Sequence, residues 1–410
     1  MKRLLYIVFV LAFCIASCVR EEDDLPVPPP TEEPGDGTPT DPGEENPSDT
    51  EKTILLYLPW SGNLTSYFRT NIADFEKAIQ KGILQSERVL VFFATSTSEA
   101  SLFELVYDKG QVTRVPIQTY VTPVFTTASG ITSLLTDVKE AAPANHYSLI
   151  IGAHGMGWIP VNQSTRARSI APGPKLYWEY EGGPQTRYFG ATSKQYQTDI
   201  SELAAGISGA KMNMEYILFD DCYMSSIEVA YDLRQVAKHL IGSPTEMMAY
   251  GMPYADIASY LLGSTDYESI CNAFLTFYQG YTEMPCGTLG VTVSSEVDAL
   301  ATIMKEINSR YTFDTSLTGT VQRMDGYTPT VFFDCGDYVA KLCPDITLLG
   351  RFEAQLNRTV KYRTHTDYYY SASAGKRIKI DTFSGTTISD PSTSSLASAK
   401  EETSWYKKLF

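Results

Sequence analysis

The sequence predicts an α/β fold in which a mostly parallel sheet is covered by helices on both faces. Three short segments are apolar almost throughout: 88–94 (RVLVFFA), 147–153 (YSLIIGA) and 215–219 (EYILF). Continuous apolar character is typical of strands buried on both sides, because a half-exposed strand would alternate. Helical patterns separate these strands, and such alternation indicates a largely parallel sheet.

The elements before residue 147 follow from local signals. Residues 53–58 are a short apolar run and predict a strand. The proline, glycine and asparagine within 59–63 mark a turn, after which a helical pattern continues to about residue 84. We expect a hairpin over 102–120 and a helix over 131–142.

Two helices are expected around the third buried strand. The first covers 195–207, and the second covers 225–240. The second prediction rests on apolar residues with helical spacing, namely Ile227, Ala230, Tyr231, Leu233, Val236, Ala237 and Leu240.

The first eighteen residues have the pattern of an export signal. Lys2 and Arg3 precede an apolar run too short to cross a bilayer, which ends in Ile15-Ala16-Ser17-Cys18. That ending is similar to a bacterial lipobox, so we expect residues 1–17 to be removed and Cys18 to carry lipid. A plain secretory signal and an uncleaved anchor are the alternatives. The prediction is an exported lipoprotein at the outer membrane or cell surface of a Gram-negative bacterium.

Residues 18–52 are predicted to form a disordered acidic tether. Between residues 19 and 50 there are eight prolines and eleven acidic residues against one base, so this segment cannot bury enough apolar surface to fold. The acidic residues at 21–24 either resemble the surface-export signal of Bacteroidetes lipoproteins or simply begin the tether. No similar linker interrupts residues 53–410, so we expect one large domain there.

Composition and missing motifs exclude several classes of function. The chain has a net charge of −15, of which residues 51–410 carry −7, and this mildly acidic folded part argues against a protein that tracks nucleic-acid phosphates. The sequence contains no P-loop, HExxH, CxxC or GxSxG motif, so NTPase, zincin, thioredoxin and serine-hydrolase functions have no support.

Two reactive side chains follow buried strands. His154 comes directly after the strand at 147–153, and Cys222 follows the strand at 215–219 behind two carboxylates. In parallel sheets the chemistry lies just past the carboxyl ends of strands. A cysteine thiolate and an imidazole at that edge can carry out acyl-enzyme catalysis. Each residue alone is more often structural, as a buried thiol or a core histidine, so their spacing leaves both readings open.

The sequences around both residues resemble the clostripain family of cysteine peptidases. Residues 147–158 (YSLIIGAHGMGW) and 219–234 (FDDCYMSSIEVAYDLR) are similar to its histidine and cysteine motifs. Further similar segments are 53–64, 242–254, 383–388 and 404–409, so the resemblance covers essentially 53–410. It implies a caspase/haemoglobinase-like fold, which is a three-layer α/β sandwich. It also implies a cysteine endopeptidase in which Cys222 attacks the scissile carbonyl and His154 handles the proton, without a metal.

The resemblance further implies an oxyanion hole and a specificity. Backbone N–H groups of Gly155 and Cys222 would hold the oxyanion. Asp220 occupies the position at which the family binds a basic residue, which predicts cleavage after arginine or lysine. The alternative is that Asp220 caps the following helix. Asp221 departs from the small residue common there, and its charge would raise the Cys222 thiol pKa or strengthen the preference for cations.

A polar insertion at about 159–192 is the expected processing site. Members of the family are cut in this interval at a basic residue, and the candidates here are Arg166 and Arg168. A basic-specific enzyme can cut such a loop in its own zymogen. The alternative is an ordinary solvated loop.

Five cysteines remain once the signal is removed and Cys18 is lipidated. An odd number cannot all pair, and Cys222 is the natural one to stay reduced. Cys271 with Cys286 and Cys335 with Cys343 are either disulfides or buried thiols. Some clostripain relatives depend on calcium, so calcium is an implication of the resemblance alone, since no EF-hand pattern is present.

Two functions compete at this point. The favoured one is a lipid-anchored, monomeric endopeptidase whose partners are protein or peptide substrates and, through Cys18, a membrane. The rival is a catalytically inactive surface-binding lipoprotein that retains the peptidase fold, for which Asp221 is the only local hint.

Overall fold

The central sheet positions every other element of the molecule. The structure, a computed structural model, describes residues 49–161, 190–191 and 193–410. Within these residues nine strands form one sheet in the order β10-β8-β7-β6-β5-β1-β2-β3-β4. Its central strands are parallel neighbours: β7 (Ala237–Gly242), β6 (Met214–Asp220), β5 (His146–Gly152), β1 (Lys52–Leu58) and β2 (Glu87–Ala94). The predicted α/β class with a mostly parallel central sheet is confirmed.

Antiparallel strands extend the sheet at both edges. Beside β2, the predicted hairpin consists of β3 (Glu99–Asp108) and β4 (Gln111–Val121). Beside β7 lie β8 (Thr288–Val293) and then β10 (Val360–His365). Two small two-stranded sheets pair β9 (Phe333–Asp334) with β13 (Thr387–Ile388) and β11 (Tyr368–Ser371) with β12 (Lys376–Lys379).

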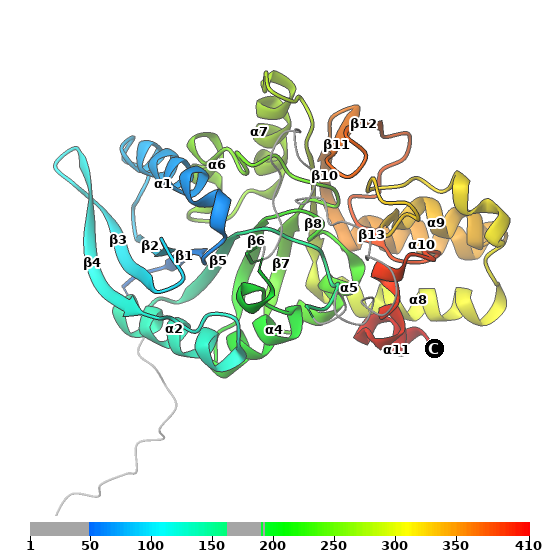
Figure 1. The fold of residues 1–410 in the computed structure, drawn as a ribbon, viewed down its shortest axis with the longest axis horizontal. Coiled ribbons are helices and arrows are strands. Elements are labelled where there is room, and N and C mark those ends of the chain that lie inside the picture. The colour runs from blue at the N-terminus through cyan, green and yellow to red at the C-terminus, as the bar shows by residue number, and fades with distance from the viewer. Residues whose placement is uncertain (1–48, 162–189, 192) are drawn as a thin grey trace, which may run out of the picture. The chain divides into compact units, whose positions relative to one another are not determined.

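Helices cover both faces of the sheet, which gives the predicted three layers (Figure 1). One layer contains α1 (Thr65–Ile79), α6 (Tyr254–Leu261) and α7 (Tyr267–Gly280); the other contains α2 (Ala128–Ala141), α4 (Ile200–Gly209) and α5 (Ile227–Leu233). Near β8 and β10 lie α8 (Val297–Arg310), α9 (Cys335–Leu342), α10 (Ile346–Thr359) and α11 (Ser404–Leu409). In the described ranges the 3-10 helices are η1 (Gly62–Leu64), η3 (Lys194–Tyr196), η4 (Ser294–Glu296), η5 (Thr315–Thr320), η6 (Ser395–Ala397) and η7 (Lys400–Glu402).

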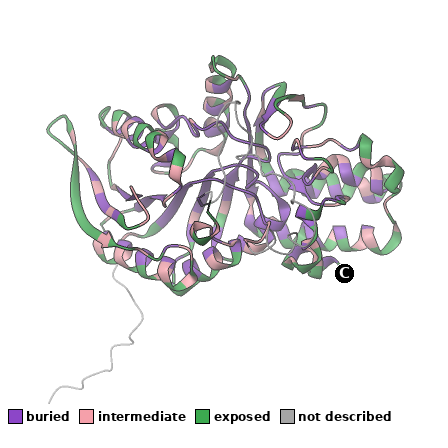
Figure 2. Ribbon diagram, viewed as in Figure 1, coloured by how far each residue is buried: buried purple, intermediate pink, exposed green. Residues whose placement is uncertain are grey.

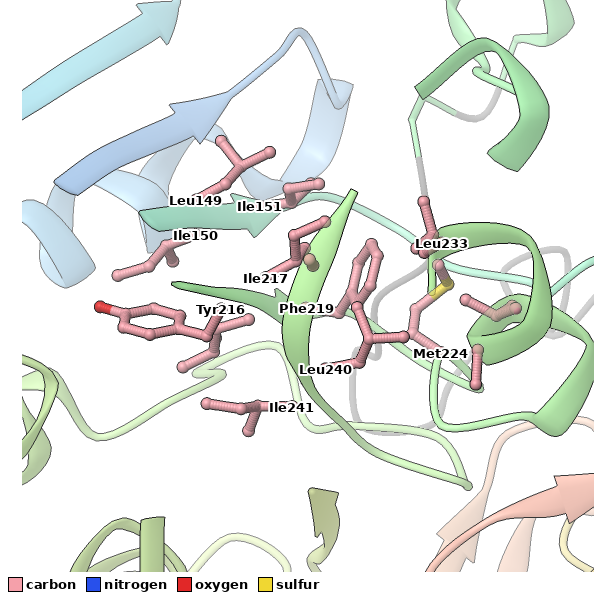
Figure 3. Packing of buried hydrophobic residues seen from close by; sticks show 14 of the residues in the cluster. Leu149, Ile150, Ile151, Tyr216, Ile217, Phe219, Met224, Leu233, Leu240 and Ile241 are labelled. Carbon is pink, nitrogen blue, oxygen red and sulfur yellow. The ribbon is translucent and has the colours of Figure 1, made fainter. Parts of the chain in front are cut away.

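The hydrophobic core lies on both sides of the central strands. Figure 2 shows burial concentrated on the strands and exposure on the outer sides of the helices. Leu149, Ile150 and Ile151 of β5 are at most 1% exposed although successive side chains point to opposite faces. Ile217 and Phe219 of β6 pack beside them (Figure 3). These strands are apolar throughout because helices cover both of their faces.

The single helix expected over 225–240 is wrong in its second half. α5 ends at Leu233, and Ala237 begins strand β7, which pairs with β6 and β8. The apolar residues after Leu233 fit a buried strand as well as a helix. They form a strand because the backbone N–H and C=O groups along the edge of β6 need hydrogen-bond partners. Two boundaries also differ, because α1 ends at Ile79 and α4 begins only at Ile200.

The pairing of β5 with β6 contains one irregularity. Tyr147 pairs with Met214, but Leu149 pairs with Ile217, so β6 carries one more residue than β5 over this stretch. Beyond that bulge the register is regular and ends with Gly152 opposite Asp220.

The residues that the structure describes form one compact unit. The predicted signal peptide, Cys18 and the tether up to residue 48 lie outside the described residues, as do Arg166 and Arg168. No helix in the described part of the chain has the length and apolar content needed to cross a membrane.

Candidate active site

The carboxyl ends of β1, β5 and β6 meet at one edge of the sheet. These strands are parallel and adjacent, and the last paired residues of β5 and β6 are Gly152 and Asp220. His154 and Cys222 each lie two residues beyond that pair. The structure therefore brings the two predicted catalytic residues to neighbouring strand ends.

The backbone of Gly155 lies directly against the backbone of Cys222. A Cβ atom added to Gly155 would lie 2.3 Å from the carbonyl oxygen of Cys222 and 3.1 Å from its amide nitrogen. Real Cβ atoms do not approach backbone atoms so closely, so only glycine fits here. The two backbone N–H groups predicted to form the oxyanion hole belong to segments in contact.

Cys222 is fully buried and is held by the loop that follows β7. The amide nitrogen of Met247 lies 3.1 Å from the Cys222 sulfur and donates to it. The next amide, of Tyr223, donates to the carbonyl of Thr245 at 3.0 Å. Tyr223 has a positive φ of 61°, a conformation that is uncommon for a residue with a side chain and that turns the chain directly after the sulfur.

His154 is also fully buried, and its ring contacts a residue that the sequence arguments did not single out. Its Nε2 atom lies 2.8 Å from Oδ1 of Asn63, in the short η1 helix that follows β1. The backbone amide of His154 donates to the carbonyl of Gly190 at 3.3 Å. Asn63 belongs to the predicted turn at 59–63, where an asparagine has an ordinary conformational explanation. The order of β1 and β5 in the sheet, which local patterns do not show, is the signal that could have identified it.

Asp220 is a buried carboxylate that does not cap a helix. It ends β6, is 1% exposed, and accepts hydrogen bonds from the Met252 amide at 2.9 Å and the Tyr254 hydroxyl at 3.0 Å. The cap of α5 is Ser226, whose side chain accepts from the Val229 amide. The capping alternative for Asp220 is therefore wrong.

Asp221 links the two strand ends. It is fully buried, and its Oδ1 accepts a hydrogen bond of 2.6 Å from the amide of Ala153, the residue before His154. This bond continues the contact between β5 and β6 beyond their last ladder pair. One oxygen of Asp221 is thus hydrogen-bonded to the backbone beside His154.

A third buried carboxylate, Glu246, fixes the Met247 loop. Glu246 accepts hydrogen bonds from the Tyr223 hydroxyl at 2.9 Å, the Ser371 hydroxyl at 2.8 Å and the Ala372 amide at 2.9 Å. Burial, together with the charge of Glu246, holds the pKa of Tyr223 well above its usual value, so this hydroxyl remains a donor. Glu246 thereby joins the residue after Cys222 to the end of β11.

The other four cysteines in the described part of the chain are buried thiols, and none of them forms a disulfide there. Burial raises the pKa of Cys271 to about 12 and that of Cys286 to about 11, and it holds the pKa of Cys335 well above its usual value. These thiols are protonated at neutral pH and are poor nucleophiles. Over the described ranges, no group of three or more His, Cys, Asp or Glu residues could hold a metal ion.

Comparison with known proteins identifies related peptidases. The family model described as the clostripain family matches residues 176–379. The crystal structure of a secreted C11 cysteine protease from Bacteroides thetaiotaomicron, "iotapain", is 58% identical with a TM-score of 0.82, over 88% of this chain and 99% of that chain. Among curated proteins, none matches the chain.

Two further solved structures are similar. A clostripain from Bacteroides thetaiotaomicron ATCC 29148, in complex with the peptide inhibitor BTN-VLTK-AOMK, is 64% identical over 54% of this chain and 99% of that chain, with a TM-score of 0.53. An inactive zymogen C11 protease from Parabacteroides distasonis is 25% identical over 89% of this chain and 100% of that chain, with a TM-score of 0.74.

Proposed function

This chain belongs to the clostripain family of cysteine peptidases, and on that premise we propose that it cuts proteins after arginine or lysine with Cys222 as nucleophile and His154 as proton carrier. Family membership makes the chain a cysteine endopeptidase. The observation that carries the residue assignment is the contact between the strand ends, where Gly155 lies against Cys222. None of the other cysteines for which burial raises the pKa offers a comparable nucleophile.

The proposed reaction is a two-step acyl transfer. The Cys222 thiol gives its proton to His154, and the thiolate attacks the scissile carbonyl carbon, whose π electrons move to the oxygen. When the tetrahedral intermediate collapses, the C–N bond breaks and His154 protonates the leaving amine. Water then attacks the thioester while His154 takes its proton, which releases the acid product and restores the thiol.

The amides of Gly155 and Cys222 are proposed to hold the oxyanion. Their segments are in contact, and glycine at 155 lets the backbone approach to within a distance that no side chain would permit. Preorganised donors of this kind contribute about 100-fold or more each to acyl transfer.

Asp220 is proposed to bind the basic side chain of the substrate. Its carboxylate is buried two residues before Cys222, and the Met252 amide and Tyr254 hydroxyl fix its orientation. A buried carboxylate favours a cationic partner, bidentately for arginine and as a point charge for lysine. The inhibitor bound to the Bacteroides thetaiotaomicron clostripain ends its peptide in lysine, which supports the same preference here. Asp221 adds negative charge next to this position.

The intact chain is proposed to be a latent precursor that cuts itself at Arg166 or Arg168. Both His154 and Cys222 are fully buried in the uncut chain, which supports low activity toward other proteins before the cut. The Gly190 carbonyl, near the end of the insertion, accepts a hydrogen bond from the His154 amide, so the insertion is connected to the site that the cut is proposed to activate. The similarity to an inactive zymogen from Parabacteroides distasonis supports this proposal.

Export with a lipid on Cys18 is proposed from the sequence. The related iotapain is described as secreted, which supports export of this chain. Lipid attachment rests on the similarity of residues 15–18 to a lipobox.

The chemistry requires no metal because each proton and charge is assigned to a protein group.

The test uses fluorogenic peptides with arginine, lysine or norleucine before the reporter. The exported chain should cleave the first two, Cys222→Ala should abolish cleavage, and Cys271→Ala, which removes a buried thiol on α7, should retain it. Asp220→Asn should lower kcat/KM for the basic peptides by about 100-fold or more, because it leaves the basic side chain without its charged partner. Exposed Asp256 on α6 provides the matched control, Asp256→Asn.

Turnover that survives Cys222→Ala would refute the assignment of the nucleophile. No turnover in a folded and processed sample would support the rival function, an inactive binding protein. Equal losses for basic and neutral peptides in Asp220→Asn would assign Asp220 a structural role instead.

A further inference from the structure

We propose that Asn63 is the residue that positions His154, and that it fixes both the ring orientation and the tautomer needed for catalysis. This inference rests on the proposed function of His154 as proton carrier. It is carried by the 2.8 Å contact between Oδ1 of Asn63 and Nε2 of His154. Together with Cys222, the two residues place one side chain after each of three adjacent parallel strands, β1, β5 and β6.

The chemistry of the two groups sets the direction of the hydrogen bond. An amide oxygen only accepts, so the ring nitrogen that faces it carries the hydrogen. His154 is therefore protonated at Nε2, and Nδ1 is the nitrogen assigned to exchange the proton with Cys222. The tautomer of a catalytic histidine is set in this way by the partner of its other ring nitrogen.

The backbone around Asn63 is anchored, so the point from which its side chain reaches His154 is fixed. Leu64 is fully buried, and Ser61 donates its hydroxyl to the Pro59 carbonyl at 2.9 Å. Thr65 donates to the Gly62 carbonyl at 3.0 Å, which closes the turn. Gly62 has a φ of 67°, a conformation that suits glycine and that brings the chain round into η1. Asn63 thus projects from a short hydrogen-bonded turn rather than from a long loop.

Residues that follow β1 and β6 hold His154 from two sides. Asp221 accepts from the Ala153 amide and so anchors the backbone next to His154, while Asn63 anchors the ring. A neutral amide also stabilises the imidazolium less than a carboxylate would. The partner is therefore suited to a histidine that must both accept and release a proton within each turnover.

The experiment compares Asn63→Ala, Asn63→Asp and a control, Asn145→Ala, in the full exported chain after processing. Asn145 is an exposed asparagine just before the opposite end of β5. The readouts are kcat and KM on an arginine peptide, and the pH profile of Cys222 alkylation by iodoacetamide. Circular dichroism and thermal unfolding report whether each variant folds.

Asn63→Ala should lower kcat about 10- to 100-fold and leave KM within about twofold, because the ring loses its orienting partner but the substrate keeps its contacts. Asn63→Asp should restore most of kcat and move the alkaline limb of the profile upward by about one pH unit, because a carboxylate favours the imidazolium. Asn145→Ala should match wild type in every readout.

An unchanged kcat in folded Asn63→Ala would overturn the proposal. If that variant does not fold, Asn63→Asp decides the question. An unshifted pH profile, or a kcat about 10- to 100-fold below that of wild type, then overturns the positioning role. Failure of the proposed function looks different, because cleavage would then either persist in Cys222→Ala and His154→Ala or be absent from the folded and processed wild-type chain. Loss of cleavage in both of those variants with full activity in Asn63→Ala refutes the positioning role alone.

Discussion

Replacing Glu228 by glutamine should change how the stability of the folded domain depends on pH. Glu228 is the second residue of α5 and is only 2% exposed. Its Oε1 accepts from the Ser389 amide at 2.8 Å, whereas Oε2 has no hydrogen-bond partner among the described residues. Burial is the main cause that raises the pKa of Glu228 from 4.5 to about 7, with hydrogen bonds opposing it in part.

The size of the effect follows from that pKa. At about 1.4 kcal/mol for each tenfold change in proton affinity, the displacement of Glu228 corresponds to about 3 kcal/mol. Below about pH 4.5 the carboxyl is protonated in the folded and unfolded states, so it contributes no difference. Between pH 4.5 and 7 only the folded state keeps the proton, so the free energy of unfolding falls as the pH rises. Above about pH 7 the carboxylate is ionised in both states, and its burial lowers the free energy of unfolding by the full amount of about 3 kcal/mol.

The assay is urea unfolding at pH 4 and pH 8, followed by tryptophan fluorescence in a Cys222→Ala background that prevents self-cleavage. Glutamine imitates the protonated carboxyl at every pH, so Glu228→Gln should equal its parent at pH 4 and exceed it by about 3 kcal/mol at pH 8. Glu353→Gln, which changes an exposed glutamate on α10, should follow the parent. A difference between Glu228→Gln and its parent that is the same at both pH values would refute the reasoning.

Two further predictions concern the backbone contact and the processing site. Gly155→Ala should reduce kcat/KM by about 100-fold, because its Cβ would lie 2.3 Å from the Cys222 carbonyl oxygen and force the two segments apart. Peptide cleavage by a folded sample checks this, beside Gly350→Ala, whose Cβ would meet no atom within 4 Å; equal activity of the two variants would contradict it. Replacing Arg166 and Arg168 together by alanine should leave one band on a denaturing gel, since the two residues proposed as the cleavage sites are gone. Two fragments from that variant would dispose of the assignment.

The sequence predicts those parts of the fold that depend on local burial. The runs at 147–153 and 215–219 are apolar because both faces of β5 and β6 are covered, and that pattern is visible without neighbours. The boundary between α5 and β7 is not visible in this way. Apolar residues after Leu233 satisfy both periods, and only the free edge of β6 selects the strand.

The residues of the candidate site also differ in whether local sequence could reveal them. His154 and Cys222 could be found because each follows a strand that its own sequence reveals, and because their surroundings resemble a known family. Asn63 could not be found, since its importance depends on β1 lying next to β5, and sheet order is a non-local property. The capping alternative for Asp220 failed for a related reason, because the chain makes a turn after β6 before Ser226 starts α5.

The bulge between β5 and β6 determines which side chain reaches the level of His154. With a regular ladder, Leu149 would face Tyr216 and Gly152 would face Phe219, so Asp221 rather than Cys222 would stand opposite the imidazole. The extra residue of β6 that sets this phase lies near Tyr216, about 20 Å along the chain from the sulfur at the rise of an extended strand. Deleting one residue there would shift Cys222 out of register with His154. The proposed enzyme would then be inactive although every side chain of its site stayed in the sequence.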